Sequence, residues 1–280
     1  MDPGVRLRAR GLSYRYPDGT EALSGIDLDV RSGEFVGVLG SNGSGKTTLL
    51  GALDGLLKDY RGSVRLDGQE VRALTPREIY RKVGLVFQNP DNQLFAATVA
   101  EDVAFGPHNM GFEEEEVHRR VLRALKAVDM HEHARKGIHN LSFGQKKRVS
   151  IAGLLAMGHE VLLMDEPTGG LDPMGEYAMM ELLMALNREG VTIVMATHSV
   201  DLVPLVLSTR HILSHGRITR GGSPEEVFTA PEDMARVKLR LPHIAELIWQ
   251  LRDRDGVTFP RLPHTVGEAR RLLRERLAGA

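Results

Sequence analysis

The 280-residue chain has 42% hydrophobic and 26% charged residues, a composition typical of an ordinary globular protein. Its 36 Lys and Arg residues nearly balance its 37 Asp and Glu residues, which excludes a global electrostatic field directed at nucleic acid or an anionic membrane. The absence of cysteine excludes disulfides and thiolate metal ligands and fits a reducing cytosol. No stretch reaches the roughly 18 uninterrupted apolar residues that a membrane-spanning helix needs.

The N-terminal part of the chain predicts two kinds of strand. Residues 7–11 and 22–30 alternate apolar and polar side chains, which indicates antiparallel strands on either side of a turn at residues 17–19. Phe35–Leu39 is a continuous apolar run, typical of a strand that is buried on both faces. A helix is expected to follow it from about Gly45.

Strands and helices alternate further along the chain. Buried strands are predicted at residues 83–87, 161–164 and 192–196, with helices between them, for example over residues 176–187. This βα alternation is typical of a mostly parallel sheet. We therefore expect an α/β fold.

Two regions depart from this alternation. Residues 89–158 are rich in helical spacing and predict a helical insertion with a small core of its own. After about residue 231 the apolar residues again keep helical spacing, with a break expected at Pro242. The clearest helices are predicted at residues 113–128 and 266–277. The expected division is a body over residues 1–230 and a C-terminal helical extension over residues 231–280.

A glycine-rich loop follows the first buried strand and fits the pattern G-x-x-x-x-G-K-[ST]. Its glycines allow backbone N–H groups to surround closely spaced phosphate oxygens, and the next helix presents its positive N-terminus to them. Lys46 would add a full charge at the β- and γ-phosphates, and the Thr47 hydroxyl is a suitable oxygen ligand for Mg²⁺. A glycine-rich turn beside a surface lysine is the alternative, and the strand in front of the loop favours a nucleoside triphosphate site. The predicted loop residues are Gly40, Ser41, Asn42, Gly43, Ser44, Gly45, Lys46, Thr47 and Thr48.

Two carboxylates end the apolar strand in "VLLMDEPT". At the carboxyl edge of a parallel sheet, Asp165 is placed to hold the Mg²⁺ shell, and Glu166 is placed to orient or deprotonate an attacking water. An acidic pair after a strand is also common as a plain helix cap. Together with the glycine-rich loop, the pair favours hydrolysis over simple binding.

The segment "LSFGQKKRVSIAG", residues 141–153, lies between these two motifs. In this order and spacing, the chain resembles the ATP-binding subunit of ABC transporters over about residues 5–230. The resemblance implies a P-loop NTPase of the ABC type, with a mostly parallel sheet core, an antiparallel N-terminal sheet, a helical insertion and a C-terminal helical extension. It also implies that Ser142, Gly144 and Gln145 open a helix that meets the γ-phosphate of ATP on the opposite subunit, a role that suits a serine-capped helix N-terminus.

The same resemblance assigns the remaining positions. Gln88 resembles the glutamine that reaches Mg²⁺, so that Thr47, Gln88 and Asp165 form the expected metal set. Asp172 resembles the aspartate of a loop that crosses a dimer interface, and His198 resembles the switch histidine that contacts the γ-phosphate and acts in catalysis with Glu166. Tyr16 is expected to stack on adenine, with Tyr14 as the alternative.

The chain departs from the ABC pattern at two places: Phe143 stands where glycine is usual, and Gly169-Gly170 where a serine–alanine pair is usual. Neither place carries chemistry, so competent hydrolysis is expected. One chain holds one phosphate loop and one LSxGQ-type segment. If each site needs a piece from two subunits, the working unit is a two-fold dimer, and the complete set in this chain favours a homodimer over a pair with a sister subunit.

Residues 87–107 and 14–23 are similar to the energy-coupling-factor group of these ATPases, most of all to the cobalt-transport (CbiO-type) subunit. This implies an ATP-hydrolysing motor for import of a divalent metal, cobalt first and nickel next. The implied partners are an integral-membrane coupling subunit and a substrate-capturing membrane subunit, with no nucleic acid. The implied location is peripheral, on the cytoplasmic face of the inner membrane. A groove at residues 89–95 is expected to receive a short helix of the membrane subunit.

Three alternative functions use parts of the same sequence pattern. A vitamin importer of the same group would use the same motor. A soluble ABC-type ATPase acting on DNA or ribosomes is disfavoured, because the chain shows neither a long heptad segment nor a second cassette. A phosphotransferase would leave the LSFGQ segment and His198 unexplained.

The histidines lack metal-ligand spacing with a carboxylate and are expected at the surface, so Mg²⁺ is the expected direct metal beside ATP.

Overall fold

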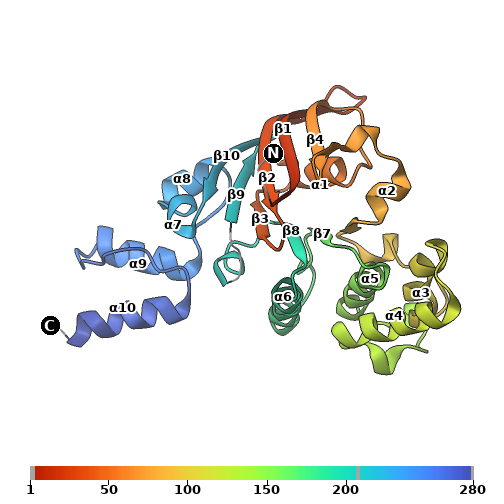
Figure 1. Ribbon diagram of the computed structural model, residues 1–280. Coiled ribbons are helices and arrows are strands. Elements are labelled where there is room, and N and C mark those ends of the chain that lie inside the picture. Colours follow the sequence, from red (N-terminus) through yellow and green to blue (C-terminus); the bar gives the residue numbers. More distant parts are fainter. Residues whose placement is uncertain (1–3, 206–208, 279–280) are drawn as a thin grey trace.

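The computed structural model describes residues 4–205 and 209–278, and its strands form two sheets (Figure 1). The smaller sheet is antiparallel, in the order β2-β1-β4-β5. Its strands are β1 (Val5–Arg15), β2 (Glu21–Arg31), β4 (Arg61–Leu66) and β5 (Gln69–Glu70). The predicted antiparallel pair on either side of residues 17–19 is confirmed, whereas β4 and β5 were not predicted.

The larger sheet has the order β10-β9-β3-β8-β7-β6, and its middle is parallel. The parallel strands are β3 (Phe35–Leu39), β6 (Val83–Val86), β7 (Val161–Asp165) and β8 (Thr192–Thr197). Every residue of β3, β7 and β8 is buried, which explains why these strands read as continuous apolar runs. All four lie where the sequence predicts them.

Two further strands extend this sheet beyond β3. β9 (Thr209–Ser214) runs parallel to β3, and β10 (Arg217–Gly222) returns antiparallel to β9. Neither strand was predicted, because their sequences are short and alternate with arginine, histidine and glycine rather than forming an apolar run. The sheet is still mostly parallel, as expected.

One helix lies between the two sheets. α1 (Lys46–Leu53) follows the loop after β3, and all of its residues except Thr47 are buried. Its apolar side chains share a buried cluster with Leu7 of β1 and Leu163 of β7. The loop in front of α1 is thereby fixed from both sides. The other helices of the body are α2 (Pro76–Tyr80), α6 (Pro173–Arg188) and α7 (Pro224–Val227).

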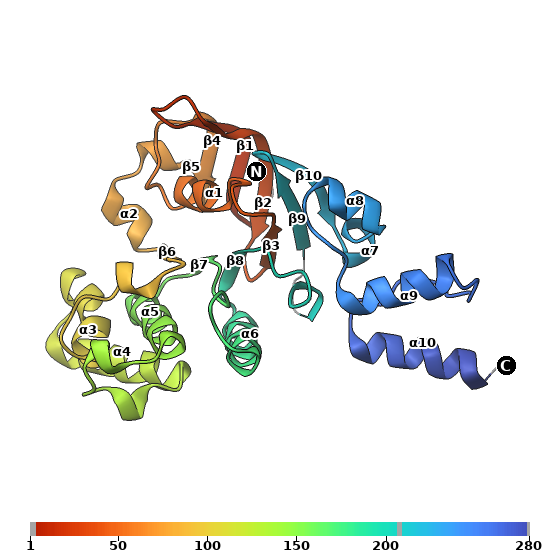
Figure 2. The ribbon, with the colours of Figure 1, turned by 180° about the vertical axis from the view of Figure 1, so that it is seen from behind.

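The predicted insertion is helical and lies beside β6 and β7 (Figures 1 and 2). Its helices are α3 (Val99–Asn109), α4 (Glu114–Ala127) and α5 (Phe143–Met157). Its apolar side chains, such as Val121, belong to the same buried cluster as Met164 and Leu183 of the sheet and α6. The expectation of a separate small core is therefore wrong, and α5 joins the insertion to the sheet.

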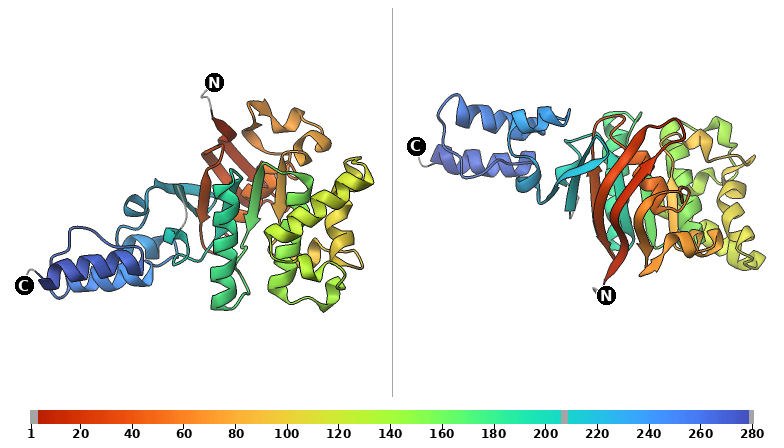
Figure 3. Two further views of the ribbon diagram at one scale, coloured as in Figure 1. Left: turned by 60° about the horizontal axis from the view of Figure 1, so that its bottom comes forward. Right: turned by 90° about the horizontal axis from the view of Figure 1, so that it is seen from above.

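The C-terminal helices are α8 (Pro231–Arg236), α9 (His243–Asp253) and α10 (Val266–Ala278). Pro242 caps α9, which confirms the predicted break. α9 and α10 lie side by side at the end of the molecule away from the insertion (Figures 1 and 3), around a small cluster that includes Ile248 and Ala269. Among the helices of the described residues, none has the length and apolar character to cross a membrane.

Candidate nucleotide-binding site

The parallel register of β3, β7 and β8 brings the predicted motifs to one edge of the sheet. Leu39 pairs with Thr197, and Asp165 pairs with Ala196. The phosphate loop, Glu166 and His198 follow directly after these positions. Residues that are far apart in sequence therefore converge at the carboxyl ends of the strands, where open α/β sheets bind ligands.

The glycine-rich loop runs from β3 into α1 and needs glycine at two positions for distinct reasons. A Cβ atom on Gly40 would lie 2.4 Å from Ser44 Oγ and 2.5 Å from the Leu213 carbonyl oxygen. Gly45 caps α1 with φ of 107°, and a Cβ atom there would lie 2.5 Å from the Ala22 carbonyl oxygen. The strand–loop–helix geometry that the motif predicts is present, with the first N–H groups of α1 at the loop.

Lys46 folds its side chain back into this loop. Its Nζ donates to the carbonyl oxygens of Gly40, at 2.8 Å, and Ser41, at 3.2 Å. It also lies 3.4 Å from Glu166 Oε1 in a buried ion pair. A buried lysine ammonium that begins the helix after a glycine-rich loop is suited to bind closely spaced phosphate oxygens.

Thr47 and Asp165, two of the three predicted metal ligands, contact each other. Thr47 Oγ1 donates to Asp165 Oδ2 at 2.7 Å. Burial raises the pKa of the Asp165 carboxyl, and the Thr47 hydrogen bond opposes that rise. Gln88 is exposed, and it lines one cavity together with Thr47 and Asp165. A hydroxyl, a carboxylate and an amide oxygen are the hard oxygen donors that Mg²⁺ takes together with phosphates, so these residues fit the ion.

Glu166 holds an unusual backbone conformation directly after β7. Its φ is 48°, which is rare for a residue with a side chain and costs on the order of 1–3 kcal/mol. Its N–H donates to the Ala196 carbonyl oxygen at 2.9 Å, and its Oε2 accepts from Thr197 Oγ1 at 3.1 Å. Both contacts anchor a buried carboxylate at the edge of the sheet, where it is available to a water molecule.

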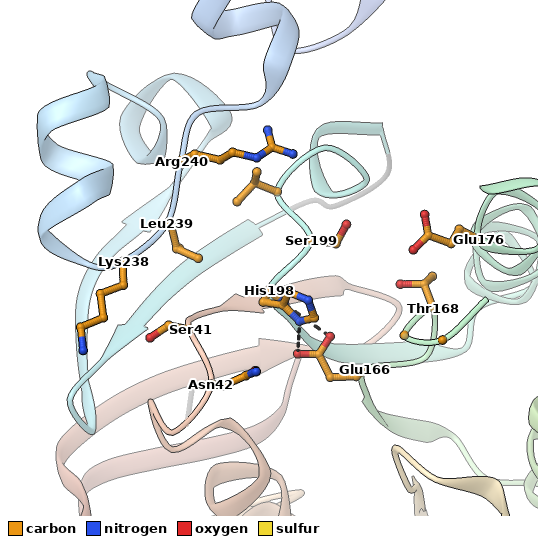
Figure 4. Close-up of a pocket in the computed structure, with 13 residues that line it drawn as sticks. Ser41, Asn42, Glu166, Thr168, Glu176, His198, Ser199, Lys238, Leu239 and Arg240 are labelled. Carbon is orange, nitrogen blue, oxygen red and sulfur yellow. Dashed lines mark hydrogen bonds and ion pairs between the residues drawn. The ribbon is translucent and has the colours of Figure 1, made fainter. Parts of the chain in front are cut away.

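His198 lies against this carboxylate. Its Nδ1 is 2.9 Å from Glu166 Oε1, as Figure 4 shows, and its side chain is otherwise about half exposed. Glu166 Oε1 therefore lies between the Lys46 ammonium and the His198 ring. This arrangement links the phosphate loop to the loop after β8 through one carboxylate.

Two cavities meet at Glu166. The first, here named the P-loop cavity, has a volume of about 460 Å³ and includes Tyr16, Lys46 and Asp165 in its lining. The second, here named the His198 cavity, has a volume of about 670 Å³ (Figure 4). Asn42 and Glu166 line both. The lining of the His198 cavity includes residues that the sequence did not indicate: Glu176, Lys238, Leu239 and Arg240.

The two tyrosines occupy different environments. The Tyr16 ring is partly exposed in the P-loop cavity, and its hydroxyl lies 3.0 Å from Thr48 Oγ1. Tyr14 packs against the buried cluster between the sheets and meets Tyr16 edge-to-face at 5.0 Å. Tyr16, not Tyr14, therefore offers a ring to a ligand in this cavity.

The LSFGQ segment begins α5. Ser142 caps the helix by accepting from the Gln145 N–H, and the Gln145 side chain accepts from the Ser142 N–H at 3.1 Å. Within the described chain, Ser142, Gly144 and Gln145 are not part of the lining of either cavity. Asp172 likewise caps a helix, α6, by accepting from the Gly175 N–H at 2.6 Å. These residues are thus not brought to the Glu166 edge of their own chain.

Lys147 is a site residue that sequence reasoning missed. Its buried Nζ donates to the carbonyl oxygens of Glu166, Pro167 and Gly169 at 2.7–3.0 Å. Burial lowers the pKa of this ammonium to about 8. Nothing in "QKKR" distinguishes Lys147 from its partly buried neighbours, because its partners are backbone atoms 19 to 22 residues away.

His211 also differs from expectation, since it lies half-buried in β9 rather than at the surface. Burial lowers the pKa of its imidazole. Among residues 4–205 and 209–278, no three His, Asp or Glu side chains form a group that could hold a metal ion on their own.

Comparison with known proteins agrees with this geometry. Residues 23–169 match the family model described as ABC transporter. The chain is 47% identical over 275 residues to the energy-coupling factor transporter ATP-binding protein EcfA of Methanococcus maripaludis, covering 98% of this chain and 99% of that protein.

Solved structures are similar too. The cbiO1 protein of Clostridium perfringens, part of the ABC transporter complex cbiONQ, is 43% identical with a TM-score of 0.77, covering 88% of this chain and 99% of that one. A dimeric ATP-binding cassette in a post-hydrolysis state, bound to ADP and Pi, is 30% identical with a TM-score of 0.70, covering 78% and 98%. The chain therefore belongs to the ABC transporter family, as an ATP-binding and ATP-hydrolysing subunit similar to those of energy-coupling-factor transporters.

Proposed function

We propose that this chain is the motor subunit of an energy-coupling-factor importer for a divalent metal, cobalt first and nickel next. The observation that carries the motor role is the Glu166 carboxylate, buried between Lys46 and His198 beside the Thr47–Asp165 pair. The metal substrate rests on the sequence similarity of residues 87–107 to cobalt-transport subunits. The similarity to cbiO1 supports the same subgroup.

Each residue at the carboxyl edge of the parallel sheet would have a distinct role in ATP hydrolysis. Lys46 and the backbone N–H groups of the loop would hold the β- and γ-phosphates, and Tyr16 would stack on adenine. Thr47, Gln88 and Asp165 would hold Mg²⁺, which when bound supplies positive charge to the phosphate oxygens. Glu166 would orient and deprotonate the attacking water, and the His198 ring would fix this carboxylate and contact the γ-phosphate.

A second copy completes the site in this proposal. Ser142, Gly144 and Gln145 begin α5 with polar groups and N–H donors at a helix N-terminus, an anion-binding arrangement. Because they lie outside the cavities of their own chain, they are available to the γ-phosphate held by a partner. Asp172 would cross the same interface. ATP binding would then close the homodimer, and hydrolysis would reopen it.

The membrane partner would dock beside α3. Phe95 is 65% exposed and meets the exposed Phe105 edge-to-face at 4.6 Å, whereas neighbouring Leu94 is buried in the core. An exposed aromatic pair beside the segment after Gln88 suits the apolar face of a short helix. The chain would thus sit peripherally on the cytoplasmic face of the inner membrane, with residues 1–230 as the motor body and residues 231–280 as the extension.

The test is uptake of radiolabelled cobalt and nickel by cells that carry the complete transporter, with either the native chain or Glu166→Gln. Uptake of one metal that the substitution abolishes is the expected result. Glu181→Gln, an exposed position on α6, is the matched control and should leave uptake unchanged. Negligible uptake of both metals by the native transporter would overturn the metal assignment. Loss of a vitamin uptake on Glu166→Gln would then favour the vitamin-importer alternative.

A further inference from the structure

The linker between α8 and α9 lies along the His198 cavity. Lys238, Leu239 and Arg240 are part of the cavity lining, opposite Glu176 of α6 (Figure 4). The chain turns into the linker at Lys238, whose φ of 56° is rare for a residue with a side chain. The C-terminal extension thus reaches the catalytic edge of the sheet through this linker.

The linker is joined to the His198 loop through one carboxylate. Asp201 lies three residues after His198, and both of its oxygens accept from the extension. Arg240 contacts Asp201 with both Nη1 and Nη2. The His243 N–H donates to Asp201 Oδ1 at 2.8 Å, and His243 Nδ1 lies 3.2 Å from Oδ2. A two-pronged arginine–carboxylate pair fixes orientation as well as distance.

Apolar packing between the His198 loop and the linker accompanies the contact of Asp201 with Arg240 and His243. Val200 and Val203 of the His198 loop and Leu241 of the linker are buried in the same cluster. His198 itself has a half-exposed ring. The position of that ring therefore depends on how the loop from residue 198 to residue 203 is held, and the extension holds it at Asp201.

The negative charge of Asp201 also acts on the Glu176 carboxyl in the lining of the His198 cavity. Burial raises the pKa of the Glu176 carboxyl, His198 lowers it, and Asp201 raises it. Arg240 therefore neutralises an anionic charge close to the place where a triphosphate would bind. The contact has two separable effects, one on the position of the loop and one on the local potential.

We propose that Asp201 and Arg240 are positioning residues, through which the C-terminal extension holds the loop of His198 in place against Glu166 for ATP hydrolysis. This inference rests on the proposed catalytic roles of Glu166 and His198. It assigns the extension a part in the ATPase cycle: a movement of α9 and α10 would be transmitted to His198 through the Asp201–Arg240 pair.

The test measures kcat and KM for ATP hydrolysis by the full chain as Asp201→Asn, Arg240→Gln and the double variant. A positioning role predicts that each single variant lowers kcat by about 3- to 10-fold, and that the double variant is no worse than either. A purely electrostatic role predicts opposite shifts in the KM for ATP. Asp201→Asn removes a negative charge near ATP and should lower KM, whereas Arg240→Gln removes a positive charge and should raise it. Opposite shifts in KM with unchanged kcat would overturn the proposal.

Three controls separate the possible failures. Arg236→Gln breaks an exposed ion pair with Asp233 on α8 and should leave kcat unchanged. Glu166→Gln should abolish hydrolysis, and if it does not, the proposed function fails rather than the positioning role. ATP affinity and the melting temperature of each variant show whether it is folded. If Asp201→Asn does not fold, Arg240→Lys carries the test, because it keeps the charge and loses the two-pronged geometry: a lowered kcat supports the proposal and a native kcat overturns it.

Discussion

The ring of Phe143 packs on Gly170: a Cβ atom on Gly170 would lie 3.1 Å from Cε1 of Phe143. These are the two places where the chain departs from the ABC pattern that it otherwise resembles. The departures are therefore one structural unit, in which a large side chain at the start of α5 fits against a glycine in the turn after Glu166. The same turn accepts the hydrogen bonds of Lys147, whose Nζ lies 5.2 Å from the Phe143 ring centroid.

Gly170→Ala should destabilise the protein by about 1–3 kcal/mol, because φ is 78° and the new methyl group would crowd Phe143. The measurement is the free energy of unfolding in urea. Gly190→Ala is the matched control: its φ is 94°, but no atom lies within 4 Å of a new Cβ, so it carries the backbone penalty alone. Equal losses in the two variants would show that Phe143 plays no part. In a Phe143→Gly background, Gly170→Ala should cost no more stability than Gly190→Ala does in the native chain.

Lys147→Met should lower both the stability and the rate of ATP hydrolysis. The substitution leaves the carbonyl oxygens of Glu166, Pro167 and Gly169 without their buried donor, which costs about 2–5 kcal/mol. Because one of these carbonyls belongs to Glu166, we expect kcat to fall. The control variant Lys146→Met loses only an ion pair with the exposed Asp91, and its kcat should stay near native. Unfolding in urea and steady-state hydrolysis measure the two effects. A Lys147→Met protein with native kcat would contradict the expectation.

Local signals in the sequence suffice for one part of the site. Phe35–Leu39 and the loop to Thr48 are contiguous, so strand, turn and helix N-terminus follow from one short segment. Asp165 and Glu166 also end a recognisable buried strand. Parallel pairing of these strands then explains why the two motifs meet, so the edge of the sheet could be predicted before its geometry was known.

The rest of the site depends on long-range contacts that leave no local pattern. Lys147 differs from Lys146 only in facing the turn after β7, and Arg240 matters because it meets Asp201, 39 residues earlier. β9 was missed for the same reason, since its pairing with β3 gives it burial that its mixed composition does not indicate. The insertion core was mispredicted because helical spacing shows which face is buried, not what covers it.

Asp54 should make the stability of the protein fall as pH rises. Burial raises the pKa of this carboxyl from 3.8 to about 7. A pKa that is higher in the folded than in the unfolded state gives stability that is complete below about pH 4 and is lost as pH rises toward 7. Asp54→Asn removes this loss, so its advantage over the native chain in unfolding free energy should grow by about 2 kcal/mol between pH 5.5 and pH 8. Asp59→Asn, an exposed neighbour, should show no such growth, and a pH-independent difference for Asp54→Asn would refute the assignment.

The Thr47–Asp165 pair should set the Mg²⁺ requirement of hydrolysis. Chelation with EDTA should abolish activity. Asp165→Asn should raise the Mg²⁺ concentration for half-maximal hydrolysis by about tenfold or more, because a neutral amide is a weaker ligand for Mg²⁺ than a carboxylate. Titration of Mg²⁺ at saturating ATP measures this shift. Asp18→Asn alters an exposed carboxylate in the turn between β1 and β2 and is the control for loss of surface charge. If Asp165→Asn kept the native Mg²⁺ requirement while lowering kcat, Asp165 would act on Glu166 and the attacking water instead of on the metal.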